Sequence, residues 1–110
     1  MKMKPKHPVE RYEAQARIAK ALAHPTRLMM LDVLADREWC VCELTELVRV
    51  DQSTVSKHLS VLKQAGIVSD RKQGTMTFYR QRVSCLRGFW QCIESVLKAN
   101  LRTQEAAIGV

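Results

Sequence analysis

The segment from Asp51 to Gly66 constrains the fold most, because it carries signals for both ends of a helix. Asp51 is a residue type that accepts hydrogen bonds from the free N–H groups of a helix N-terminus. Gly66 suits the left-handed position that follows a helix C-terminus. Between them, Val55, Leu59 and Leu62 recur at i, i+4 and i+7. The sequence therefore predicts an amphipathic helix that packs on one face and is free on the other.

Apolar residues at helical spacing extend over most of the chain, which has only four Gly and three Pro residues to interrupt it. The pair His24-Pro25 separates a first helix from a second, since Pro suits the first position of a helix. Two extended segments after Gly66 flank a positively charged, turn-rich tip, which predicts a β-hairpin. We expect helices at about 9–23, 52–65 and 85–101, a second helix that starts at Pro25 and is closed by residues 36–38, and a short third helix that carries Leu44, Leu47 and Val48. Extended segments are expected at 67–70 and 76–82, with the tip at 71–75.

A length of 110 residues fits a single domain. We expect a flexible basic arm at residues 1–8, one domain at residues 9–101 and a tail at residues 102–110. The sequence has no run of eighteen apolar residues, and its charged start lacks the apolar region of a signal peptide. These features predict a cytoplasmic protein without a membrane partner.

Polar side chains gather at the start of the helix after Asp51, mostly off its apolar face. They are Gln52, Ser53, Thr54, Ser56, Lys57 and His58. A short helix, a tight turn and a helix with such a start form the geometry that enters the DNA major groove. In the hairpin, Arg71, Lys72 and Arg80 suit the phosphate backbone, and the net charge of +7 favours a polyanion. The alternative is that these small polar residues only solvate an amphipathic helix.

Three stretches of the chain resemble the ArsR/SmtB family of arsenical repressors: AHPTRL at 23–28, DQSTVSKHLSVLKQAGIV at 51–68, and the hairpin. The resemblance covers about residues 10 to 100. It implies a fold that is mainly α with a small β-hairpin, a winged helix-turn-helix, assembled as a homodimer through its first and last helices. It also implies a repressor that binds a palindromic double-stranded operator and is released by an inducer.

Cys40 and Cys42 lie at or just before the start of the helix that precedes the DNA-reading one. In a regular helix, residues i and i+2 point about 200° apart, so joint binding of one atom requires a non-helical or unwound start. Two thiolates select soft, thiophilic species. The motif WCVCEL at 39–44 is similar to the LCVCDL inducer site of the family's arsenite and antimonite sensors, and to its cadmium, lead and zinc sensors. The resemblance implies As(III) or Sb(III) as the inducer, with Cd, Pb or Zn as alternatives.

The third cysteine of the arsenite sensors is replaced here by Thr45, whose hydroxyl is a poor soft ligand. A third thiolate can come from Cys85, Cys92, a partner subunit or an exogenous thiol, or two thiols can suffice. Cys85 and Cys92 are seven residues apart, about 10.5 Å along a helix, so at most one joins a given site. Cys92 lies beside an apolar stripe and is more simply a small buried hydrophobe.

Two alternatives remain for Cys40 and Cys42: a thiol-redox or persulfide switch, and two incidental core cysteines. The last helix contains no His, so the zinc site that other family members carry there is not expected. We expect His24 to cap or precede the second helix, and Trp39 and Trp90 to anchor the core or an interface. The sequence shows no phosphate loop and no nucleophile with a base, which predicts a protein that is not an enzyme and needs no cofactor to bind DNA.

Overall fold

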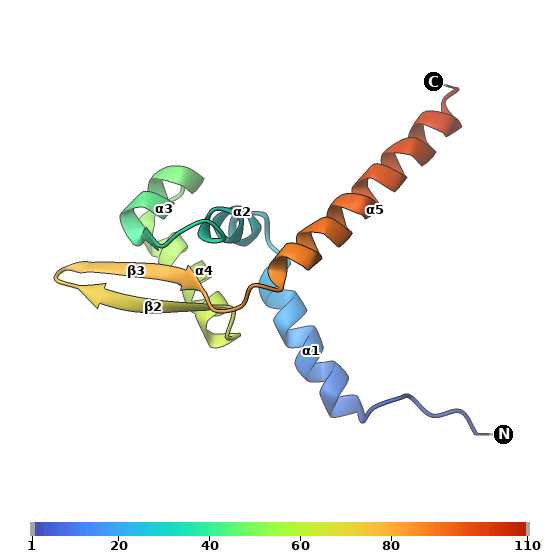
Figure 1. Cartoon of the computed structure of the whole chain (residues 1–110), viewed down its shortest axis with the longest axis horizontal. Helices are drawn as coiled ribbons and strands as arrows, with labels where there is room; N and C mark the ends of the chain where they lie inside the picture. Colours follow the sequence, from blue (N-terminus) through green and yellow to red (C-terminus); the bar gives the residue numbers. More distant parts are fainter. Residues whose placement is uncertain (1, 110) are drawn as a thin grey trace.

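A computed structural model describes residues 2–109; Met1 of the predicted arm and Val110 of the predicted tail lie outside it. Helices α2, α3 and α4 and a small sheet form a head, from which α1 and α5 project as two arms (Figure 1). Within the described residues, the elements are α1 (Val9–Leu22), α2 (Pro25–Leu34), β1 (Trp39–Cys40), α3 (Val41–Val48), α4 (Gln52–Gln64), β2 (Val68–Gln73), β3 (Met76–Gln81) and α5 (Leu86–Ala107). The mainly α, winged fold predicted from the sequence is confirmed.

Helix α4 lies as its pattern predicts. Val55, Leu59 and Leu62 are fully buried in a core shared with α2, α3 and the sheet. The Asp51 carboxylate accepts a hydrogen bond from the Thr54 backbone N–H at 3.3 Å, which caps the helix. Gly66 follows the C-terminus with a φ of 84°, a value that favours glycine.

Helix α2 begins at a His-Pro pair, also as predicted. The His24 Nδ1 atom accepts a hydrogen bond from the Thr26 backbone N–H at 3.1 Å, and Pro25 occupies the first turn. Trp39 and Trp90 pack against the core as the predicted anchors.

The sheet differs from the prediction in two respects. The expected five-residue tip is wrong, because the antiparallel ladder continues through Arg71 and Lys72, which pair with Phe78 and Thr77. The turn is confined to Gly74, with a φ of 62°, and its neighbour. A third strand, β1, was not expected; it pairs with β3 and gives the order β1-β3-β2. Two residues are too short to show the alternation that marks a strand.

Helix α5 extends to Ala107, six residues beyond the predicted end at Leu101. Residues 102–107 include no Gly or Pro, so nothing in the sequence stops the helix before Gly109. Every described residue from 91 onward is exposed in the protomer, including Cys92, whose predicted burial the protomer alone does not provide. The reason is that α5 projects away from the head (Figure 1).

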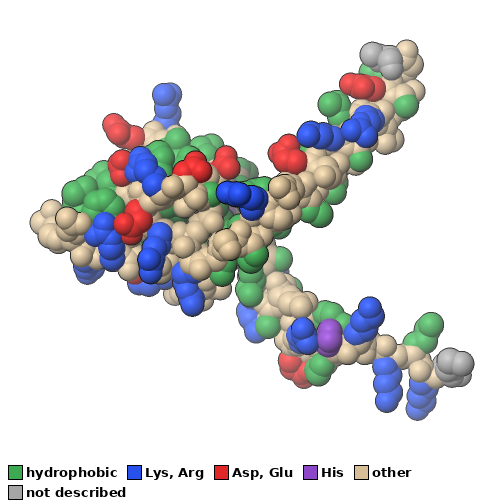
Figure 2. Space-filling view, viewed as in Figure 1, with side chains coloured by type: hydrophobic (Ala, Val, Ile, Leu, Met, Phe, Trp, Pro, Cys, Tyr) green, Lys and Arg blue, Asp and Glu red, His purple; other side chains and the backbone are tan. Residues whose placement is uncertain are grey.

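Both arms carry large apolar side chains that the protomer leaves uncovered. On α1 these are Val9, Tyr12 and Ile18, and on α5 they are Ile93, Val96, Leu97 and Leu101. Figure 2 shows apolar side chains along both arms. Within residues 2–109, none of the helices combines the length and the apolar character needed to cross a membrane.

The packed face of α4 predicts the effect of one core truncation. Leu59→Ala removes a fully buried side chain and leaves a cavity, so the free energy of unfolding should fall by about 2–5 kcal/mol. Urea unfolding at one fixed protein concentration measures this change. Ser60→Ala, at the exposed neighbouring position, is the control and should change stability by less than about 0.5 kcal/mol. Equal midpoints for the two variants would contradict the packing described.

Candidate DNA-reading surface and thiol site

The free face of α4 presents a small set of exposed polar side chains. Gln52, Ser56 and Lys57 are exposed. The Ser53 and Thr54 hydroxyls instead donate to the Asp51 carboxylate, the latter at 2.6 Å. These hydrogen bonds, from Ser53 first and then Thr54, lower the pKa of Asp51 to about 2. Of the six α4 residues predicted to read DNA, Ser53 and Thr54 therefore stabilise the helix start, and Gln52, Ser56 and Lys57 leave their side chains exposed without such a hydrogen bond.

His58 lies apart from this surface. Its ring is half-buried, and its Nδ1 atom accepts a hydrogen bond from Arg27 Nε at 3.0 Å. The His24 ring lies against it, with 4.3 Å between centroids. Burial lowers the pKa of His58, and the neighbouring His24 and Arg27 lower it further. The expectation that His58 faces DNA or solvent is corrected: this side chain packs α4 onto the start of α2.

The hairpin β2–β3, which we call the wing, holds Arg71 and Lys72, two of its three predicted cations, differently. Arg71 Nε donates to both carboxylate oxygens of Glu38, at 3.1 and 3.0 Å, and its guanidinium lies over the Phe78 ring. The hydrogen bond from Arg71 lowers the pKa of Glu38. Lys72 is exposed and has no ion pair within residues 2–109. Lys72 is thus free for an external anion, whereas Arg71 ties the wing to the chain just before β1.

Cationic side chains are distributed unevenly over the surface. Figure 2 shows Lys and Arg side chains along one edge of the head and along the N-terminal arm. Arg80, the third cation predicted in the hairpin, donates from Nε to Ser69 Oγ at 3.1 Å and remains exposed. A basic edge beside an exposed polar helix face is the electrostatic arrangement that phosphate binding uses.

Cys40 and Cys42 lie at the junction of β1 and α3. Cys40 is extended, with φ −80° and ψ 162°, and α3 begins at the next residue. Cys40 is the N-cap of α3: its Sγ atom accepts from the Glu43 N–H at 3.5 Å, and its own N–H donates to Glu43 Oε1 at 3.0 Å. Cys42 is exposed. The helix therefore starts between the two cysteines, which is the non-helical start that joint ligation requires.

The two thiols differ in their surroundings. Burial raises the pKa of Cys40, and hydrogen bonding with the side chains of Glu43 and Cys42 raises it further, against the lowering effect of the Glu43 N–H. The Cys40 N–H lowers the pKa of Glu43, and Arg37 adds to this effect through an ion pair of 3.2 Å. Cys40 is thus a protonated thiol held beside a carboxylate, and a ligand must displace its proton to bind it.

The predicted third ligands do not join this pair within the protomer. Thr45 Oγ1 donates to the Val41 carbonyl oxygen at 2.7 Å. Cys85 is exposed at the start of α5, and Cys92 is exposed on the arm. In the part of the chain that the structure describes, no three His, Cys, Asp or Glu side chains lie close enough to share a metal ion.

A cavity of about 210 Å³ opens between α3, α4 and the wing. We call it the wing cavity. Its lining includes Cys42 together with two side chains of the free face, Gln52 and Ser56. The other lining residues are Val41, Thr75, Met76, Thr77 and Tyr79. Sequence reasoning did not find this cavity, because it depends on the unexpected strand β1.

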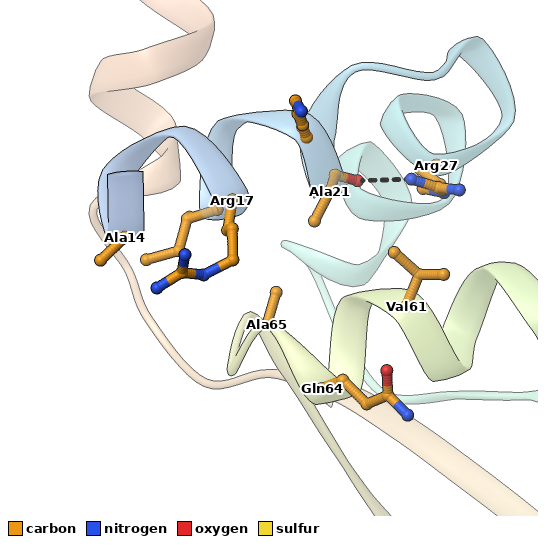
Figure 3. Close-up of a pocket in the computed structure, with 9 residues that line it drawn as sticks. Ala14, Arg17, Ala21, Arg27, Val61, Gln64 and Ala65 are labelled. Atoms are coloured by element: carbon orange, nitrogen blue, oxygen red, sulfur yellow. Dashed lines mark hydrogen bonds between the residues drawn. The ribbon is translucent and has the colours of Figure 1, made fainter. Parts of the chain in front are cut away.

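A second cavity, of about 420 Å³, lies between α1 and α4 (Figure 3). Arg17, Lys20 and Arg27 contribute cations to its rim, and Arg27 Nη1 donates to the Ala21 carbonyl oxygen at 3.3 Å. None of the residues predicted to bind DNA or thiophilic ligands lines it. The two cavities therefore lie at different faces of α4.

The cysteines are connected physically to both parts of the DNA-facing surface. The β1–β3 pairing sets Cys40 opposite Phe78 of the wing. The Glu38–Arg71 ion pair links the residues before β1 to the same hairpin. Helix α3, which begins at Val41, packs against α4. A change in the backbone at Cys40 therefore acts on the wing and on α4 together.

Comparison with known proteins identifies relatives of the chain. A family model described as "Bacterial regulatory protein, arsR family" matches residues 24–70. The chain is 49% identical over 72 residues to the uncharacterized HTH-type transcriptional regulator MJ1325 of Methanocaldococcus jannaschii, covering 64% of this chain and 81% of that protein. It is 36% identical over 84 residues to the arsenic resistance transcriptional regulator ArsR1 of Pseudomonas putida, covering 76% of this chain and 66% of ArsR1.

Among solved structures, the chain is similar to the homodimeric winged helix-turn-helix DNA-binding domain Mb0332 of Mycobacterium bovis, determined by solution NMR. The TM-score is 0.74 at 28% identity, and the match covers 94% of this chain and 95% of that one. The resemblance extends over the head and both arms.

The packing of His58 predicts how stability depends on pH. Its pKa lies below the ordinary value of 6.5, so the folded protein binds fewer protons than the unfolded chain in mildly acidic solution. The stabilisation from neutral His58 is present above about pH 6.5 and is lost as the pH falls toward its folded pKa. His58→Asn should therefore lose less stability than wild type between neutral pH and about pH 5.5.

Chemical unfolding at several pH values measures this difference. His7→Asn, in the N-terminal arm, is the matched control and should follow the wild-type curve. If His58→Asn also follows that curve, His58 does not titrate in the way that its contacts indicate.

Proposed function

This chain belongs to the arsR family of bacterial regulatory proteins, and we propose that it is a homodimeric repressor released from operator DNA by trivalent arsenic or antimony. One observation carries the proposal: Cys40 and Cys42 lie where β1 meets α3. Cys40 pairs with the wing through β1, and Cys42 lies in the first turn of α3, the helix before α4. The family consists of transcriptional regulators, and we propose no catalytic role.

The DNA-binding step uses the free face of α4 and the wing. In this proposal, Gln52, Ser56 and Lys57 face the major groove, where their side chains are suited to base edges and phosphates. Lys72 neutralises a flanking phosphate from the wing. The support is that these side chains are exposed, whereas Val55, Leu59 and Leu62 of the same helix are buried.

The dimer forms through the two arms. Helix α5 carries an uncovered apolar stripe, formed by Ile93, Val96, Leu97 and Leu101. On α1, the Ile18 side chain is likewise apolar and exposed. Stripes of this kind on projecting helices are stabilised by burial against another helix. The similar Mb0332 domain is a homodimer. A two-fold dimer places two α4 helices on a palindrome with half-sites about one helical turn apart.

Release begins at the cysteines. As(III) is a soft acceptor that binds thiolates. Each S–As bond that forms on As(OH)3 breaks one As–O bond, and the thiol proton leaves with that hydroxide as water. The Cys40 Sγ atom, which caps α3 by accepting from the Glu43 N–H, is then also bonded to arsenic. The sulfur has lost its proton and lies beside the Glu43 carboxylate. Both effects disturb the first turn of α3. A ligand held by Cys42 also borders the wing cavity, next to Gln52 and Ser56 of the DNA-reading face.

A second candidate function uses the same residues. Cys42 is exposed and Cys40 lies beside it, which is the arrangement of a thiol that is oxidised or persulfidated and then resolved by its neighbour. Cadmium, lead and zinc are further candidate effectors for two thiolates. A gel shift of the protein–operator complex against arsenite, antimonite, cadmium, lead, zinc and a persulfide donor distinguishes these functions.

The effector site predicts the behaviour of a double variant. Cys40→Ser/Cys42→Ser should bind operator DNA but remain bound at arsenite concentrations that release wild type, because a hydroxyl is a poor soft ligand. The gel shift with arsenite measures the difference. Cys92→Ser, on the exposed arm, is the control and should be released like wild type. Release of the double variant at the wild-type concentration would disprove the site.

The DNA-reading surface predicts the salt dependence of binding. Lys57→Ala or Lys72→Ala should lower operator affinity and reduce the slope of log K against log salt by about two, since each variant dimer loses one phosphate contact in each of its two protomers. Fluorescence anisotropy with a labelled operator at several salt concentrations measures the slope. Lys98→Ala, on the α5 arm, should keep the wild-type slope. Unchanged slopes in both test variants would remove these lysines from the interface.

A further inference from the structure

We propose that Met76 of the wing supplies a third soft donor to Cys40 and Cys42, and that this set binds a soft monovalent cation, Ag(I) or Cu(I). The inference rests on the proposed function, because it takes the two cysteines as the effector site. It adds a ligand from a second structural element, strand β3. It also adds a class of effector, soft monovalent cations, that two thiols alone do not select.

Strand register and the wing cavity bring Cys42 close to Met76, and Cys40 lies two residues before Cys42. In the antiparallel pairing of β1 with β3, Trp39 lies opposite Tyr79 and Cys40 opposite Phe78. Two further steps of the same register would set residue 42 opposite Met76. The chain turns into α3 at Val41 instead of continuing the ladder, so a space remains at that level. This space is the wing cavity, which Cys42 and Met76 both line.

Met76 is a suitable third donor where other candidates are not. The Thr45 hydroxyl is hydrogen-bonded to the Val41 carbonyl oxygen, and Cys85 and Cys92 belong to the other side of the molecule, on α5. Besides Cys42, Met76 is the sulfur-bearing residue among those that line the wing cavity.

The exposure of Met76 fits this role. Its side chain is 41% exposed, at the start of β3, although a thioether gains nothing from contact with water. An unbranched side chain with three rotatable bonds is able to swing toward the cavity without a change in the backbone.

The donor set determines the kind of cation. Binding of Ag(I) to the two cysteines releases two thiol protons, while the thioether coordinates as a neutral donor without losing one. Thiolate and thioether sulfur together favour soft ions such as Cu(I) over hard ions such as Mg²⁺ or Ca²⁺. A cation held in this way links the start of α3 to the wing, in addition to the contacts that α3 already makes with β3.

The test uses the reduced chain of 110 residues and Ag(I) in chloride-free buffer. Calorimetric titration in the presence of a competing thiol gives the affinity. Met76→Leu keeps the volume and apolar character of the side chain but removes the sulfur. It should weaken Ag(I) binding by about tenfold or more, as the loss of even an outer partner of a metal ligand does. Met29→Leu, which alters a similarly exposed methionine on α2, should bind as wild type does.

A spectroscopic arm reports on the sulfur directly. In protein labelled with ¹³C at its methionine methyl groups, Ag(I) should shift the resonance that disappears in Met76→Leu and leave the Met29 resonance in place. Equal Ag(I) affinities for Met76→Leu and Met29→Leu, or an unmoved Met76 resonance at saturation, would overturn the proposal. The arsenite gel shift of Cys40→Ser/Cys42→Ser tests the proposed function separately, so failure of the two ideas is distinguishable.

Discussion

The burial of one face of α4 is the interaction on which the rest of the structure depends. Val55, Leu59 and Leu62 are fully buried, and this fixes the rotation of the helix about its own axis. Gln52, Ser56 and Lys57 are then exposed without any further interaction to hold them outward. Because the Asp51 cap and Gly66 fix both ends, the helix has little freedom to present another set of side chains. Its displacement therefore requires a change in α2, α3 or the wing, which form its support.

Strand β1 connects the cysteines to the elements that pack against α4. A pair of thiols on a surface helix would bind a ligand without consequence for distant residues. Here Cys40 belongs at the same time to a sheet shared with the wing and to the N-terminal cap of α3. Glu38 on one side and Glu43 on the other are held by Arg71 and Arg37, so the segment is fixed at both ends. A ligand that alters the backbone between these ion pairs changes the position of both DNA-facing elements.

Local signals account for what the sequence predicts well. Asp51, Gly66 and Pro25 act within one or two turns of their own helices, so the ends of these helices follow from the sequence. The spacing of the three apolar residues of α4 likewise predicts which of its side chains stay exposed. The wing turn and β1 depend on pairing between distant residues, such as Cys40 with Phe78, which no local pattern records. His58 illustrates the same limit: its sequence position on α4 suggests the DNA face, but contact with Arg27 draws it inward. In our proposal, Met76 comes close to the cysteines through the pairing of β1 with β3, which local sequence patterns do not predict. The sequence analysis therefore did not identify Met76 as a third ligand.

Thermodynamic linkage between effector binding and DNA binding constrains the affinity of any effector of this protein. An effector that lowers DNA affinity by a given factor must itself bind the DNA-bound protein more weakly by the same factor. The structure offers two sources for this difference. One is the rearrangement of the α3 cap when Cys40 loses its proton, and the other is the position of Gln52 and Ser56 on the wall of the wing cavity. A small ion acts mainly through the first, whereas a bulky adduct on Cys42 also meets the DNA-reading side chains directly. The size of the effector therefore determines how far release depends on movement of the backbone and how far on occupation of the DNA-reading face.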